Sequence, residues 1–251
     1  MPTPFMHLHT AEQILDMTKA NGNGRLHQTI SAEWPAFYLG SVAPDVNAIS
    51  PLSRLSTHFY DVPPAPEETA YGAMLEMYPQ LVDFASMSAG QAVCVAAYSA
   101  HLMLDLIWLR EIVYPFFYKA DHLGDRKQRQ LTHFILLTYL DTIAIEALPQ
   151  TAELTLAAAK PKEWLPFVDD SILISWREML TEQLAPGSAI RTIEIYAGRL
   201  KMSADEFAAN LKDPAWMKAQ IFDKIPVDEV QHILQTAVPR SVELIQNYLP
   251  S

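Results

Sequence analysis

The chain has 251 residues, of which 50% are hydrophobic and 10% aromatic, and its 29 acidic and 18 basic side chains give a formal net charge of −11. This composition supports a sizeable buried core without help from disulfides. The single cysteine, Cys94, excludes an intramolecular disulfide. The acidic balance argues against binding of long nucleic acid, because phosphate neutralisation needs clustered Lys and Arg. A small phosphorylated substrate remains compatible, since metal ions can supply positive charge.

The start of the chain, residues 1–5, has no basic segment and no long apolar stretch, so it does not resemble a secretory signal and we expect a cytoplasmic protein. The most apolar segment, residues 92–109, approaches the length of a membrane span. It contains His101 and Asp105, and an Asp at mid-membrane costs about 2.5–3.5 kcal/mol. We therefore interpret this segment as a buried core helix and predict no transmembrane segment.

Helical patterns dominate the chain, whereas the 8 glycines and the scarcity of alternating Val/Thr runs disfavour strands. The first predicted helix begins at Thr10, an N-cap candidate, and ends near Ala20, before two Asn-Gly pairs. A short aromatic-rich helix is predicted over residues 32–40.

A proline-rich loop is predicted over residues 43–66. A structureless segment of that length inside a compact domain is usually functional or disordered. This one contains Asp45 and His58 together with neighbouring aromatic and acidic residues, so we interpret it as a functional loop.

The remaining helices are predicted over residues 67–86, 88–118, 125–147, 172–184, 189–200, 203–212, 214–224 and 226–249. Pro239 should kink or split the last of them. No shift in composition divides the chain, so we predict a single all-α domain over residues 1–251. The part beyond about residue 160 carries no recognisable chemistry.

His101 and Asp105 are four residues apart on a predicted helix, so their side chains share one face. Taken alone, such a pair is more often a structural hydrogen-bonded pair than a metal site. Its flanks are apolar on every side, however, and an Asp is almost never fully buried unless it is paired or bound to a cation. The surroundings therefore favour a cation.

Three further residues are ambiguous when each is taken alone. Asp45 follows a proline, and an Asp in that position most often forms part of a turn. His58 lies beside two aromatic residues, where packing or surface exposure is the common reading. His7 and His9 are two apart, so only one of them is expected to face a shared site.

Four short segments match a known family in order and approximate spacing. They are Pro-Phe-Met-His-Leu at 4–8, Tyr-Leu-Gly-Ser-Val-Ala-Pro-Asp at 38–45, Thr-His-Phe-Tyr at 57–60, and the His-xxx-Asp helix at 97–105. With them the chain resembles the bacterial zinc-dependent phospholipase C family over roughly residues 1–145. The resemblance implies a multi-helix domain of the phospholipase C and single-strand nuclease type.

The resemblance also implies a ligand set. Asp45, His58, His101 and Asp105 would hold one zinc, and His7 with a bridging Asp105 would contribute to a second. It favours His7 over His9 as the residue that faces the site. Imidazole nitrogens and carboxylate oxygens are the ligands that zinc prefers. The related position makes Asp45 the candidate to orient or deprotonate the attacking water.

The chain departs from the family in ways that affect the substrate. Secreted members begin with a Trp that binds zinc, where this chain has Met1. A further zinc in those members uses a His at the position where this chain has Glu111. It also uses a His-xxx-Glu on the next helix, where this chain has His133 followed by Leu137. His133 and Asp141, eight apart, remain a possible alternative pair on one face. The residues that cradle choline are not recognisable, so a full three-zinc, choline-specific site is not expected.

Two classes of function follow. The first is a zinc-dependent phosphoric ester hydrolase, a phospholipase C-like phosphodiesterase that uses one to two zinc ions on a small phosphorylated or phospholipid substrate. The alternative is a metal-binding protein of the same fold without hydrolase activity. A nuclease or phosphomonoesterase is a third possibility, and the net charge of −11 counts against a polynucleotide substrate.

Overall fold

The fold, taken from a computed structural model, describes the whole chain except residues 21, 23, 66, 68, 186, 189, 190, 250 and 251. The described residues form helices and no strand, which confirms the predicted all-α class. The α-helices are α1 (Pro4–Ala20), α2 (Gly24–Ala32), α3 (Trp34–Val42), α4 (Arg54–His58), α5 (Ala70–Met77), α6 (Ala89–Ile107), α7 (Arg126–Ala147), α8 (Ala152–Ala157), α9 (Asp170–Leu184), α10 (Thr192–Leu200), α11 (Ala204–Lys212), α12 (Pro214–Met217) and α13 (Val227–Tyr248). Shorter or wider helical turns are η1 (Ala43–Ala48), η2 (Pro79–Val82), η3 (Trp108–Tyr118), η4 (Asp121–Leu123) and η5 (Lys218–Phe222).

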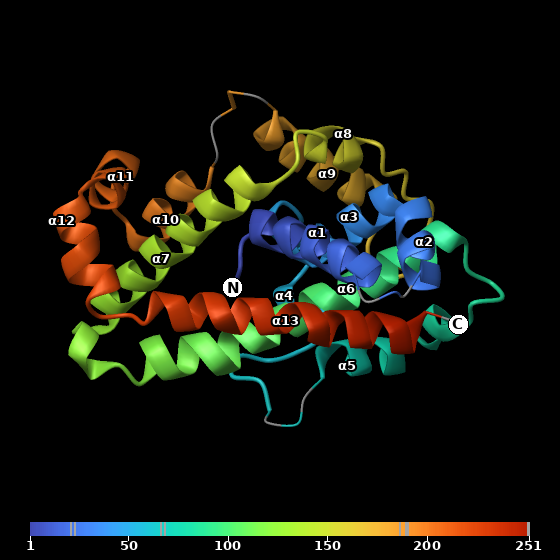
Figure 1. Cartoon of the computed structure of the whole chain (residues 1–251), viewed down its shortest axis with the longest axis horizontal. Coiled ribbons are helices and arrows are strands. Elements are labelled where there is room, and N and C mark those ends of the chain that lie inside the picture. Colours follow the sequence, from blue (N-terminus) through green and yellow to red (C-terminus); the bar gives the residue numbers. More distant parts are fainter. Residues whose placement is uncertain are drawn as a thin grey trace.

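Helix α6 is the centre of the fold. It packs against α3 on one side and α13 on another, and α1 contacts α3, α7 and α13. Figure 1 shows α13 crossing in front of α6, with α1 alongside it. Within the described chain, Ala89–Tyr118 is the one helical stretch long and apolar enough to cross a membrane, and 89% of its most apolar window is buried inside the protein. The segment is therefore enclosed by other helices, as we predicted for a core helix.

Two large hydrophobic clusters meet on the central helices. One contains Phe5 of α1 and Leu106 of α6, together with residues of α3 and α9. The other contains Met6 of α1 and Trp108 of η3, together with residues of α7 and α10. Helix α1 contributes to both clusters, and α6 contributes to the first and continues into η3 of the second, so burial of apolar surface fixes the backbone that carries their buried polar side chains.

The first helix begins well before the predicted start at Thr10. Proline is favoured in the first turn of a helix because its fixed φ fits and its missing N–H would be unpaired there, which explains the start at Pro4. The hydroxyl of Thr10 donates to the Met6 carbonyl at 3.0 Å, as a residue inside a helix does. His7 and His9 consequently lie on a rigid helix and not in the segment before it.

The segment predicted as a loop over residues 43–66 contains helical turns. Asp45 lies in η1, and His58 is the last residue of α4. The Ser53 hydroxyl caps α4 by accepting a bond from the Ser56 N–H at 3.1 Å. The two candidate ligands of this segment are therefore held in regular turns.

The helix predicted over residues 67–86 is shorter, since α5 ends at Met77 and the separate turn η2 follows it. The other predicted helices are found with small shifts at their ends, and residues 189 and 190 of one of them lie outside the described residues. Helix α7 begins with a capping box, in which the Asp125 carboxylate and the Gln128 amide each accept the other's backbone N–H. Two helices, α2 and α8, were not predicted. Of the kink or split predicted at Pro239, the split does not occur, because α13 continues through it, packed against α1 and α6.

Candidate metal centre

The five predicted ligand residues meet at one place, although they come from four separate elements. His101 and Asp105 lie one turn apart on α6, with 3.8 Å between Nε2 and Oδ2. From α1, the Nε2 of His7 lies 3.5 Å from Oδ1 of Asp105. From α4, the Nε2 of His58 lies 3.5 Å from Oδ1 of Asp45 and 3.5 Å from Oδ2 of Asp105. The four residues other than Asp45 are each at most 2% exposed.

These residues form two overlapping groups of potential ligands. One is His7, His101 and Asp105, and the other is Asp45, His58 and His101; within each group the ligand atoms lie within 4.8 Å of one another. One imidazole nitrogen binds one ion, so His101 can serve only one group at a time. The two oxygens of Asp105 face different sides, one toward His7 and the other toward His58.

Several atoms of this cluster are buried without a hydrogen-bond partner. Among the described residues, Nε2 of His7, Nε2 of His101 and Oδ1 of Asp105 have none. The rings of His7 and His101 stack with 3.5 Å between centroids and 11° between planes. Burying unpartnered polar atoms is costly, and a cation bound between imidazole nitrogens and carboxylate oxygens would satisfy them. The donor set fits zinc.

The protonation states suit metal binding as well. Burial lowers the pKa of His101 to about 3, so its imidazole is neutral at neutral pH. Burial opposes ionisation of Asp105, but its imidazole neighbours outweigh that effect and hold its pKa well below the ordinary value. Burial likewise acts against ionisation of Asp45, but the bond from His58 and the electrostatic effects of His101 and His58 together outweigh it and lower the pKa of Asp45. Neutral imidazoles and ionised carboxylates are the forms that bind metal.

The chain matches the zinc-dependent phospholipase C family over residues 6–184. It belongs to that family. The match contains all five cluster residues and extends past residue 145, where the motifs described above end, to the last residue of α9. Zinc is the cofactor that this membership implies, and the two groups of His and Asp could hold it. No curated protein and no solved structure matches the chain.

A second layer of contacts orients the histidines of this phospholipase C-family protein. Nδ1 of His101 lies 2.8 Å from the Ser41 carbonyl, and Nδ1 of His58 lies 2.9 Å from the Thr57 hydroxyl. Such contacts fix the ring and leave Nε2 for the metal. Gly40 allows the close approach of α3 to α6, because a Cβ there would lie 2.3 Å from the Cys94 carbonyl oxygen.

Arg54 and Tyr60 were not predicted as site residues, yet both contact Asp105. The Arg54 Nη2 and the Tyr60 hydroxyl donate to Oδ2 at 2.9 and 3.0 Å. The Arg54 guanidinium also lies over the Tyr60 ring, 4.7 Å from its centroid. The available signal was spacing, since Arg54 precedes His58 by one helical turn. A lone Arg in a proline-rich segment does not otherwise suggest a site.

A cavity of about 280 Å³ opens beside the cluster. The cluster contributes Asp45, which is only partly buried, and Arg54 joins it. The remaining lining residues are Met1, Pro2, Thr3, Pro4, Asn47, Ala48, Phe134, Leu137, Trp176, Thr192, Ile195, Tyr196 and Arg199. Helices α9 and α10 therefore supply part of the wall, although the sequence beyond residue 160 showed no recognisable chemistry.

The alternative pairing of His133 with Asp141 is not formed. Nε2 of His133 accepts from the Trp108 indole at 3.2 Å. Asp141 accepts instead from the hydroxyls of Thr3 and Thr192, the latter at 2.7 Å. Eight residues advance an α-helix by about 12 Å, which separates the two along α7.

Glu111 and Leu137 are two other positions at which the chain departs from the family. Glu111 lies apart from the cluster, and Leu137 lies in the cavity wall. Glu111 pairs with Arg240, with 2.7 Å between Oε1 and Nη1. Leu137, which the resemblance places at the position of a Glu ligand, instead adds an apolar side chain to the cavity wall. The described residues thus provide the two overlapping groups and no third one.

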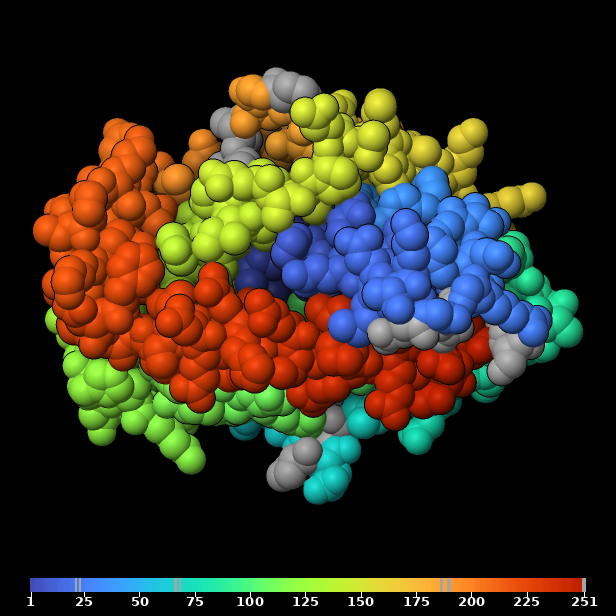
Figure 2. Space-filling model, viewed as in Figure 1, coloured from blue at the N-terminus to red at the C-terminus, as the bar shows by residue number. Residues whose placement is uncertain are grey.

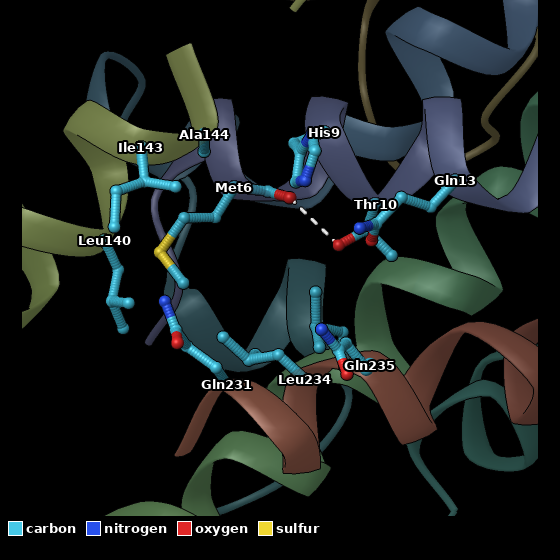
Figure 3. Close-up of a pocket in the computed structure, with 11 residues that line it drawn as sticks. Met6, His9, Thr10, Gln13, Leu140, Ile143, Ala144, Gln231, Leu234 and Gln235 are labelled. Carbon is cyan, nitrogen blue, oxygen red and sulfur yellow. Dashed lines mark hydrogen bonds between the residues drawn. The ribbon is translucent and has the colours of Figure 1, made fainter. Parts of the chain in front are cut away.

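His7 faces the cluster and His9 faces away from it, as the two-residue spacing requires, since two helical residues point about 200° apart. His9 lines a second cavity, of about 210 Å³, between α1, α7 and α13. Figure 2 shows the surface hollowed there, and Figure 3 shows His9, Thr10 and Gln13 opposite Gln231, Leu234 and Gln235. None of the described residues that line this cavity is an Asp, Glu, Lys or Arg. It lacks the charged groups that would bind a phosphate.

Proposed function

We propose that the chain is a zinc-dependent phosphoric ester hydrolase that acts as a phospholipase C-like phosphodiesterase. The single observation that supports this most strongly is the position of the cluster at the edge of an open cavity. Buried, unpartnered ligand atoms of His7, His101 and Asp105 lie behind a cavity whose rim includes the carboxylate of Asp45. A purely structural metal site is usually closed, whereas a catalytic one keeps an open position.

In this proposal Asp45, His58 and His101 hold one ion, and His7 with Oδ1 of Asp105 contributes to a second. When bound, zinc supplies the Lewis-acid charge that polarises a phosphoryl oxygen and makes water more acidic. Arg54 holds Asp105 in place from the cavity side through its bond to Oδ2. Tyr60 donates to the same oxygen, so the carboxylate cannot rotate freely.

Asp45 is the candidate base. Its carboxylate is ionised, lines the cavity and is more accessible than the rest of the cluster. It would accept a proton from a water whose oxygen attacks phosphorus, while the bond from phosphorus to the leaving-group oxygen breaks. The leaving-group oxygen then takes a proton from solvent. The products are a phosphate monoester and an alcohol.

The alternative is a metal-binding protein without hydrolase activity. The observation that favours it is the occupation of Oδ2 of Asp105, which already accepts bonds from Arg54 and Tyr60. A carboxylate neutralised by a guanidinium has less charge to offer a second ion. This alternative predicts zinc binding without turnover.

The test measures zinc and turnover in the same preparations. Protein never exposed to chelator should contain about one to two zinc ions per chain by elemental analysis. Asp45→Asn should keep most of its zinc, because the amide oxygen can still coordinate, and should lose at least about 100-fold in hydrolysis of bis(p-nitrophenyl) phosphate.

The matched control is Asp61→Asn, which removes an exposed carboxylate from the same segment and should leave both readouts unchanged. If the zinc-loaded protein hydrolysed no phosphodiester, the result would support the alternative, a metal-binding protein without hydrolase activity. Full activity in Asp45→Asn would remove Asp45 from the role of base.

A further inference from the structure

The cavity beside the cluster is positively charged apart from Asp45. Its other charged lining residues are Arg54 and Arg199, in a chain whose formal net charge is −11. This cavity of about 280 Å³ therefore contains two positively charged guanidinium groups, although the protein as a whole is negatively charged. Guanidinium groups match phosphate and carboxylate geometry.

Arg199 is available to a ligand. It is exposed on α10, at the cavity wall, with its Cζ 5.5 Å from the centroid of the Tyr196 ring. Among the described residues, no carboxylate lies within ion-pair distance of it. Its charge is thus not neutralised within the part of the chain that the structure describes.

Arg54 provides the second positive charge, closer to the cluster. Its Nη2 donates to Asp105, whereas its Nη1 is buried with no hydrogen-bond partner among the described residues. A buried, unpaired guanidinium nitrogen is costly unless an acceptor reaches it. The two arginines come from α4 and α10, so they flank the cavity from elements far apart in sequence.

We infer that this cavity selects phosphate esters that carry a second negative charge close to the phosphate, and that Arg199 recognises that second charge. The inference rests on the proposed function, since it names the substrate class of the same site. The chemistry is that of a small organic phosphate with an acidic substituent or of a lipid head group with a second phosphate.

The same wall disfavours a quaternary ammonium group. Such cations are bound by open aromatic faces. Here the Tyr196 ring stacks on Phe134, with 4.5 Å between centroids and 12° between planes, and also lies beneath Arg199. Trp176 is only 2% exposed and its indole N–H is committed to the Val42 carbonyl. A trimethylammonium group would meet Arg199 and not an open aromatic face.

The test measures binding of three phosphate monoesters to zinc-loaded protein by titration calorimetry. The probes are 2-phosphoglycolate, ethyl phosphate and phosphorylcholine, whose short arms carry a carboxylate, no charge and a trimethylammonium group. We expect 2-phosphoglycolate to bind about 5-fold more tightly than phosphorylcholine, with ethyl phosphate between, as one partly solvated charge pair provides.

Three variants assign this order to Arg199. In Arg199→Gln the three dissociation constants should converge, whereas Arg199→Lys should keep the order. Arg191→Gln removes the same charge from the other end of α10, outside the cavity, and should behave as the unmodified protein. Equal affinities in the unmodified protein, tighter binding of phosphorylcholine, an unchanged order in Arg199→Gln, or no binding at all would each overturn the inference.

Hydrolysis and vesicle binding complete the design. Absence of phosphodiester hydrolysis would defeat the proposed function, while the calorimetric order would still decide the inference. Cosedimentation with phosphatidylcholine vesicles, with and without cardiolipin, identifies the source of the ligand. Cardiolipin-dependent binding that is lost in Arg199→Gln supports a lipid head group. No vesicle binding, together with the expected order of soluble probes, supports a small organic phosphate.

Discussion

The N-terminal part of the chain and its C-terminal third contribute to the same site in different ways. His7, Asp45, His58, His101 and Asp105 all lie within the first 105 residues. Helices α9 and α10 add no ligand, but they supply cavity wall. A ligand must be a specific residue type at a specific spacing, whereas a wall needs only shape and local charge. Ligand residues therefore leave a motif in the sequence, and the residues of a cavity wall do not.

The two regions are joined by a few buried hydrogen bonds. The Trp176 indole N–H of α9 donates to the Val42 carbonyl, just before η1, at 2.8 Å. The Thr192 hydroxyl of α10 and the Thr3 hydroxyl both donate to Asp141 of α7. Substitutions of cluster residues should therefore change zinc binding, whereas substitutions of residues in the cavity wall should change stability without changing zinc binding.

The largest expected effect is that of Asp105→Ala. Asp105 faces His7 with one oxygen and His58 with the other, so its loss removes the carboxylate of the first group and a charged neighbour of His58 in the second. Arg54 and Tyr60 also lose their acceptor and keep buried donors. We expect at least a 100-fold loss of zinc affinity, measured by competition with a chelator of known affinity.

Circular dichroism of Asp105→Ala checks that it remains helical. Asp105→Asn, which keeps the size of the side chain and an oxygen, should retain more zinc than the alanine variant. A full zinc complement in Asp105→Ala would contradict the role of Asp105 as a ligand beside His7 and His58.

The candidate ligands could be predicted as a group because their chemistry is local. His101 and Asp105 were recognisable from their spacing within an apolar helix, whereas Asp45, His58 and His7 followed from the resemblance of their segments to the family. The start of α1 was missed because Thr10 looks like an N-cap, while Pro4 is equally suited to a first turn.

The wall could not be predicted for a different reason. Arg199 is an ordinary exposed basic residue by sequence, and it reaches the cavity only because α10 packs against α7. Asp141 was considered a metal ligand, but its neighbours Thr3 and Thr192 come from opposite ends of the chain. Contacts between such distant residues leave no periodic signal.

A smaller effect is expected at Asp141, and it depends on pH. Burial raises the pKa of Asp141 to about 6, from an ordinary value near 3.9. The folded state therefore holds the proton more tightly than the unfolded state, so the stability that Asp141 contributes is full below about pH 4 and is lost as pH rises to about 6. Asp141→Asn remains neutral, so at pH 8 it should be more stable than the unmodified protein by at most about 3 kcal/mol.

Urea denaturation of both proteins at pH 4.5 and pH 8 measures this difference. Loss of zinc at low pH is common to both and cancels in the comparison. The control Asp61→Asn removes an exposed carboxylate and should show no such dependence on pH. An advantage of Asp141→Asn that is equal at the two pH values would show that Asp141 is not held with a raised pKa.

The smallest expected effect is that of Trp176→Phe, and it tests whether the wall and the ligands are separable. Phenylalanine keeps most of the buried ring but cannot donate to the Val42 carbonyl, which lies in a fully buried residue. An unpaired buried carbonyl costs about 1–2 kcal/mol, so the free energy of unfolding should fall by about that amount.

Trp164→Phe is the matched control, because Trp164 is also buried but its indole N–H has no acceptor among the described residues. Zinc content should not change in either variant, since neither tryptophan belongs to the cluster. If Trp176→Phe lost zinc together with stability, the bond from α9 to Val42 would be holding Asp45 in place, and the C-terminal third would be part of the metal centre as well as of the wall.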